Sequence, residues 1–142
     1  MKRLHIEFPG NSIFKTQIKL RITDINYGNH LGNDALISII HEARVQMLQH
    51  FGFSEMDIGG AGIIMSNLAV QYKSQAFYGD VLLLEMAIDD FSATACTMYY
   101  KVSCNDKMIA LAQTGIVCYD YAKEKVTALP QVFIKAMQRQ AE

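Results

Sequence analysis

The chain has 142 residues, of which 51% are hydrophobic and 19% charged, and its formal net charge is −1. A domain typically has about 100–150 residues, so we expect one folded domain over residues 1–142. The near-zero charge and the scattered basic residues exclude the basic stripe that binding to nucleic acid requires. The composition also excludes disordered and collagen-like chains.

The N-terminus, the apolar runs and the cysteines bear on the compartment. Met1 to Pro9 contains two basic residues but lacks the apolar run of about 7–15 residues that a secretion signal needs. The apolar run Val81–Leu84 is far shorter than the about 18 residues of a membrane helix. Cys96, Cys104 and Cys118 lack metal-type spacing and suit reduced, buried thiols. We therefore expect a cytoplasmic protein without a membrane span, a metal or a cofactor.

The first half of the chain predicts a strand, a polar loop and a long helix. Phe14–Ile22 alternates apolar and polar residues, as a half-buried strand does, and a polar loop follows over 23–32. The period then becomes helical from Asn33 or Asp34, both good N-cap residues, until Gly52 ends the run. Because apolar residues also lie outside its main stripe, we expect this helix to be wrapped by a larger element. These additional apolar residues are Ala35, Ile37, Val45 and Leu48.

The second half predicts a series of strands and a short final helix. The strand-like runs, separated by turn signals, cover 63–72, 81–91, 94–102 and 108–121. A helix is expected over 131–140, after Pro130. One strand, one long helix and four further strands predict an α+β fold in which an antiparallel five-stranded sheet wraps around a central helix.

The segment 23–33 and the later Glu42-Ala43-Arg44 resemble the hotdog-fold acyl-CoA thioesterases of the hydroxybenzoyl-CoA thioesterase type. In that family the first strand ends in Asp-x-Asp. The motif His-Val-Asn-Asn follows, and then a helix that contains Glu-Ala-Arg. The likeness extends from about Ile18 to Pro130. The residues that fall on the two aspartates, the histidine and the asparagine pair are Asp24, Asn26, His30, Gly32 and Asn33.

The resemblance implies a hotdog fold and hydrolysis of an acyl thioester by water that a general base activates. The usual catalytic carboxylate of the family is the second aspartate, where this chain has Asn26. An asparagine side chain does not ionise at neutral pH and cannot be a base. We therefore expect Asp24 or Glu42 to supply the base, with Asn26 orienting the water.

The helix start is the expected binding site for the thioester carbonyl. Free N–H groups at a helix N-terminus favour the negative charge that develops on the carbonyl oxygen. Gly32, Asn33 and Asp34 occupy this position, and His30 just before them is expected to orient the substrate.

The resemblance also implies that the site lies in a groove shared with a second subunit. An unpaired edge strand needs a partner, so a homodimer is the minimum expected assembly, and a tetramer stays open. The expected substrate is a thioester of CoA or of acyl-carrier protein. The charge balance provides no basic patch for the CoA phosphates, so that contact would come from a local residue such as Lys73 or Arg44.

Structural roles compete with these catalytic ones. Asp24 and Asn26 end a strand, where short polar side chains commonly hydrogen-bond the backbone of their own loop. Glu42 would pair with Arg44 or with Arg21, unless the apolar helix gives it a raised pKa and a catalytic role.

Two further functions stay open from the sequence. The spacing of Asp24, Asn26 and His30 is similar to the hydratase motif Asp-x-Asn-Pro-x-His, but Tyr27 replaces the proline and the histidine is one residue too far. A hydratase or dehydratase acting on enoyl or hydroxyacyl thioesters is therefore one alternative. The other is a non-catalytic module that binds acyl thioesters, because Asn26 replaces the catalytic aspartate.

Overall fold

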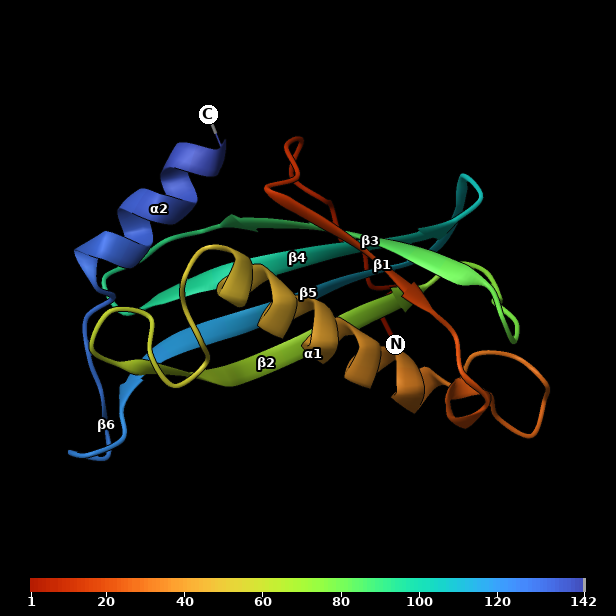
Figure 1. Ribbon diagram of the computed structural model, residues 1–142, viewed down its shortest axis with the longest axis horizontal. Helices are drawn as coiled ribbons and strands as arrows, with labels where there is room; N and C mark the ends of the chain where they lie inside the picture. Colours follow the sequence, from red (N-terminus) through yellow and green to blue (C-terminus); the bar gives the residue numbers. More distant parts are fainter. Residues whose placement is uncertain (142) are drawn as a thin grey trace.

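The computed structural model describes residues 1–141, with side chains described up to Arg139. The chain forms an antiparallel sheet with the long helix α1 lying across one face (Figure 1). The strands are β1 (Phe14–Lys19), β2 (Gly62–Tyr72), β3 (Val81–Asp89), β4 (Ala95–Cys104), β5 (Lys107–Asp120) and β6 (Lys125–Val126). The helices are α1 (Asn33–His50), α2 (Gln131–Ala141) and the short 3-10 helix η1 (Ile22–Asp24).

The sheet has the strand order β1-β3-β4-β5-β2, with β6 paired to β5. The five long strands confirm the α+β fold with a sheet against a long helix. The sheet has six strands, one more than expected, because Lys125 and Val126 pair with Asp120 and Tyr119 after a turn. A two-residue strand is too short to show the alternation by which strands are recognised in a sequence.

The core lies between α1 and one face of the sheet. Along β4 every second side chain is buried, as expected for a sheet with one face packed and one partly open. The three cysteines are free and buried, as expected. Burial raises the pKa of the Cys96 thiol to about 12, so this group is an inert part of the core. None of the helices in residues 1–141 is long and apolar enough to cross a membrane.

One side of α1 is not covered by its own chain. Leu48 is fully buried, but Ile37 is 38% exposed and Val45 39% exposed. The expectation that the whole helix is wrapped was therefore wrong for a single chain, because the sheet covers only one side of it.

Two element boundaries also differ from the sequence prediction. The first strand ends at Lys19 instead of Ile22, because the chain turns into η1 there. The N-cap of α1 is Gly32 instead of Asn33 or Asp34, and no side chain caps the helix. The carbonyl of Gly32 accepts the first bond of the helix from Leu36 N–H at 3.1 Å.

A buried polar network connects α1 to the sheet. Arg44, 7% exposed, donates through Nε to Glu55 at 3.1 Å and through Nη1 to the Tyr100 hydroxyl at 3.2 Å. The Tyr100 hydroxyl also lies 2.9 Å from Thr114 Oγ1. Burial raises the pKa of Glu55, but hydrogen bonds from His41 and Arg44 outweigh burial and hold it below its ordinary value.

We predict that Tyr100→Phe lowers the free energy of unfolding by about 1–3 kcal/mol, since it leaves buried polar groups of Arg44 and Thr114 without a partner. Urea denaturation at neutral pH measures the change. Tyr78→Phe is the control, because Tyr78 is 65% exposed, and its effect should stay within about 0.5 kcal/mol. Equal midpoints for the two variants would contradict a stabilising network.

Candidate functional site

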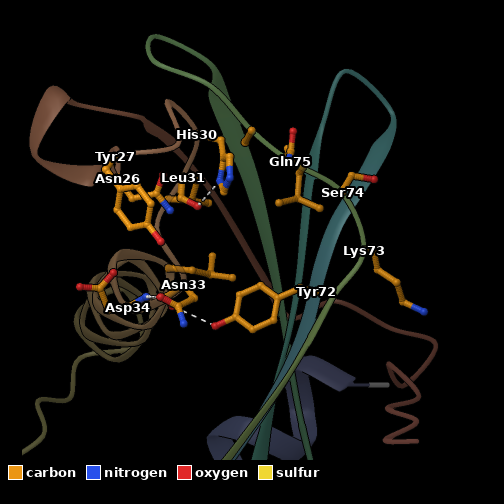
Figure 2. Close-up of a pocket in the computed structure, with 13 residues that line it drawn as sticks. Asn26, Tyr27, His30, Leu31, Asn33, Asp34, Tyr72, Lys73, Ser74 and Gln75 are labelled. Atoms are coloured by element: carbon orange, nitrogen blue, oxygen red, sulfur yellow. Dashed lines mark hydrogen bonds between the residues drawn. The ribbon is translucent and has the colours of Figure 1, made fainter.

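A cavity of about 910 Å³ lies where three segments meet: the 23–32 loop, the start of α1 and the chain that follows β2 (Figure 2). Its apolar lining residues are Leu31, Leu36, Ala76 and Ile109. Its polar lining includes Asn26, His30 and Asn33, three of the residues expected at the site. A cavity with an apolar wall and a few convergent polar groups is the usual form of a small-molecule site.

The start of α1 presents one backbone donor to this region. Gly32 N–H donates to the carbonyl of Asp24 at 2.9 Å, and Asp34 N–H donates to the Asn33 side-chain oxygen at 2.9 Å. Asn33 N–H has no acceptor within the part of the chain that the structure describes. Among the three residues expected to bind the carbonyl oxygen, Asn33 is thus the one with a free N–H.

Tyr72, at the end of β2, fixes the position of Asn33. Its hydroxyl donates to the Asn33 carbonyl at 2.9 Å, across the cavity wall (Figure 2). Burial and the negative charge of Asp34 raise the pKa of Tyr72, so the hydroxyl remains a donor at neutral pH. This bond joins the sheet directly to the helix start.

Asn26 and His30 lie on the loop that forms the opposite wall. The Asn26 side-chain oxygen accepts Gly28 N–H at 2.9 Å, and Asn26 N–H bonds the His30 carbonyl at 2.9 Å. His30 is half-buried, and Nδ1 of its ring lies 3.2 Å from the Leu31 carbonyl oxygen. Figure 2 shows the imidazole pointing into the space that Tyr72 faces from the other side.

Asp24 does not line the cavity. Its carboxylate is 5% exposed and accepts Arg21 N–H at 2.8 Å, with the Arg21 Nε at 3.5 Å. The carboxylate therefore holds its own loop, which is the structural alternative that its position at a strand end suggested.

Glu42 also lies away from the cavity. Its carboxylate is exposed on α1 and accepts a hydrogen bond from Gln46 at 3.3 Å. Arg44 pairs with Glu55 instead of Glu42 and is buried, whereas Lys73 lines the cavity. The catalytic role of Glu42 stays a prediction that depends on a second subunit.

The polar lining residues that sequence reasoning did not assign to the site chemistry include Tyr27, Tyr72, Ser74 and Gln75. Tyr72 and Asn33 are 39 residues apart, so no local spacing signals their contact. Among residues 1–141, no group of three or more His, Cys, Asp or Glu side chains is placed to hold a metal ion.

The sequence from residue 20 to 137 matches the model of the thioesterase-like superfamily. The fold is similar to a 1,4-dihydroxy-2-naphthoyl-CoA thioesterase from Synechocystis, with a TM-score of 0.80, 23% identity and coverage of 88% of this chain and 95% of that one. It is also similar to a DHNA-CoA thioesterase from Staphylococcus aureus, with a TM-score of 0.78, 18% identity and 88% coverage of each chain. No curated protein sequence gives a significant match.

The fold is that of the hotdog-fold thioesterases. Since the family match covers most of its length, the chain belongs to the thioesterase-like superfamily, whose activity is the hydrolysis of thioesters. This confirms the resemblance on which the sequence interpretation rested.

We predict that Tyr72→Phe lowers the free energy of unfolding by about 0.5–1 kcal/mol, the usual net contribution of one hydrogen bond. It should also shift the amide resonances at the start of α1, because the Asn33 carbonyl loses its partner. The matched control is Tyr27→Phe in the same cavity, since the Tyr27 side chain is fully exposed. Unchanged resonances of Asn33 and Asp34 in Tyr72→Phe would contradict this role.

Proposed function

We propose that the protein hydrolyses acyl thioesters of CoA or of acyl-carrier protein in the cavity at the start of α1. The observation that carries the proposal is the free N–H of Asn33, a residue that lines the same cavity as Asn26 and His30. Hydrolysis requires water as the second reactant and no cofactor.

The helix start would stabilise the transition state. When water attacks the thioester carbonyl, negative charge develops on the carbonyl oxygen, and a preorganised N–H donor stabilises it. Asn33 N–H is the first donor of an 18-residue helix, so the helix dipole adds to its effect. Asn26, on the opposite wall, supplies an amide to orient the water.

The acyl group would lie against Leu31, Leu36 and Ile109, the apolar wall of the cavity. Lys73 lines the same cavity and is exposed, so it would meet the phosphates of CoA or of the carrier-protein arm. Arg44 is unsuited to that contact because its guanidinium is engaged by Glu55 and Tyr100.

A homodimer at least, in the cytoplasm, is part of the proposal. Strand β2 is an 11-residue edge of the sheet, and long unpaired edges favour pairing with another chain. Met65 on this strand is 47% exposed, and Ile37 and Val45 lie uncovered on α1. A second copy on this side would cover these residues and would bring the exposed Glu42 of α1 into a subunit interface.

We predict that the purified protein releases free thiol from at least one acyl-CoA in a series that spans short, long and aromatic acyl groups. Aromatic thioesters belong in the series because two proteins of similar fold are named as DHNA-CoA thioesterases. A thiol-reactive chromophore measures the release, and size-exclusion chromatography and circular dichroism confirm that the sample is folded.

Binding of acyl-CoA without any thiol release would contradict hydrolysis and favour the non-catalytic module, in which Asn26 removed the activity. In that case Asn26→Asp should create hydrolysis. The hydratase alternative has weaker support, because the Asp24 carboxylate is engaged by Arg21 and Asp24 does not line the cavity together with His30. It would appear as loss of enoyl absorbance without free thiol.

We predict that Lys73→Ala raises KM for acyl-CoA about two- to fivefold with little change in kcat, as expected for one exposed ion pair. Lys135→Ala is the matched control, because Lys135 is an exposed lysine on α2, outside the cavity. An unchanged KM in Lys73→Ala would exclude this lysine as a phosphate contact.

A further inference from the structure

The cavity needs a base, and the expected carboxylates do not provide one within the chain. Asp24 is engaged by Arg21, Glu42 lies outside the cavity, and Asn26 cannot ionise. The proposed hydrolysis therefore depends on another proton acceptor near the free N–H of Asn33.

The ring of His30 is oriented to serve as this acceptor. Its Nδ1 lies 3.2 Å from the Leu31 carbonyl oxygen, and a carbonyl oxygen accepts but never donates. Nδ1 must therefore carry the proton of the neutral ring, which leaves a lone pair on Nε2. No residue that the structure describes hydrogen-bonds Nε2, and the ring lines the cavity.

Two glycines show how close this lone pair is to the other site groups. A Cβ at Gly28 would lie 3.1 Å from His30 Nε2 and 3.3 Å from the Asn26 side-chain oxygen. A Cβ at Gly32 would lie 3.7 Å from Asn26 Cβ. Asn26 thus lies near both His30 Nε2 and the start of α1, to which Asn33 belongs.

We propose that His30 is the general base, acting through Nε2 on a water held beside Asn26. This inference rests on the proposed thioester hydrolysis and changes the role of His30 from orienting the substrate to moving a proton.

The step balances without a further reactant. Nε2 takes one proton from water as the water oxygen forms a bond to the thioester carbonyl carbon, and Asn33 N–H stabilises the resulting oxyanion. When the intermediate collapses, the carbon–sulfur bond breaks and the imidazolium returns the proton to the thiolate. The products are a carboxylic acid and a free thiol, and the imidazole is neutral again.

Asp34 is the competing base. It lines the cavity, but its side chain is exposed and its Oδ1 lies against Gly32, 2.8 Å from where a Cβ would stand. Figure 2 shows this carboxylate pointing away from Tyr72 and His30. A histidine base and a carboxylate base would make activity rise over different pH ranges, so the dependence of activity on pH separates His30 from Asp34.

The test compares the dependence of kcat/KM on pH in the wild type, His30→Gln, Asp34→Asn and the control His5→Gln, whose side chain is exposed. The titratable or charged residues that line the cavity together with His30 are Tyr27 on its loop, Asp34 on α1, and Tyr72 and Lys73 at the end of β2. Carboxylate, tyrosine and lysine side chains ordinarily titrate outside about pH 6–7, the range in which imidazoles do. An ascending limb in that range therefore identifies an imidazole.

The expected result is such a limb in the wild type, in Asp34→Asn and in His5→Gln. His30→Gln should lose the limb and lower kcat by about 10²- to 10⁴-fold, the usual contribution of a general base. KM should change less than threefold, and circular dichroism should show an unchanged fold. A histidine that only shapes the loop would lower activity without removing the limb.

Activity of His30→Gln within fivefold of the wild type would overturn the proposal, and so would a limb below about pH 5 that Asp34→Asn removes. If His30→Gln does not fold, two measurements on the wild type test the proposal instead: the ascending limb of its pH profile and the ¹⁵N chemical shifts of the His30 ring. Shifts that place the proton of the neutral ring on Nε2 would contradict the proposal. An absence of thiol release from the wild type would instead overturn the proposed function, and the role of His30 with it.

Discussion

The buried Asp24 holds together the two ends of the loop that carries Asn26 and His30. Its carboxylate accepts Arg21 N–H at 2.8 Å, just after β1, and its carbonyl accepts Gly32 N–H at 2.9 Å, just before α1. The segment between these bonds must return on itself, which brings Asn26 and His30 to the helix start. Asp24 is 5% exposed, and a carboxylate satisfied in this way stabilises the loop; removing it would leave Arg21 N–H without this partner.

A second set of bonds ties this loop to the sheet. Leu31 N–H donates to the Ala76 carbonyl at 2.8 Å, and the Tyr72 hydroxyl donates to the Asn33 carbonyl at 2.9 Å. The Tyr72 hydroxyl is at the end of β2, and the Ala76 carbonyl is in the connection that follows this strand. The two walls of the cavity are therefore joined at two points, and the free N–H of Asn33 has a fixed direction, which is what electrostatic stabilisation of an oxyanion requires.

The sequence predicted the fold where residue patterns are strong. The helical period over α1 and the strand-like run between turn signals at β4 predicted these elements to within two residues, because burial of one face shapes both patterns. The sequence prediction was wrong where backbone geometry sets the element boundaries. These places are the 3-10 turn after Lys19, the cap at Gly32 and the two-residue β6.

The site was predictable in part for a related reason. Asn26, His30 and Asn33 lie within eight positions of one another, so a local motif was enough to place them together. The partners of Asp24 and Glu42, and the contact of Tyr72 with Asn33, depend on side-chain direction and on long-range packing. A sequence shows which residue types are present, but not which neighbour each one satisfies.

The exchange of the family aspartate for Asn26 is consistent with the charge that surrounds it. Gly32 lies between Asn26 and Asp34, since a Cβ there would be 3.7 Å from Asn26 Cβ and 2.8 Å from Asp34 Oδ1. An aspartate at position 26 would add a second carboxylate to this region, and neighbouring like charges disfavour ionisation. This chain instead keeps its negative charge on Asp34, in the first turn of α1 where the helix dipole favours an anion. In the proposed reaction the charge then develops on the thioester carbonyl oxygen, which Asn33 N–H would stabilise, and on the His30 imidazole as it takes the proton from water.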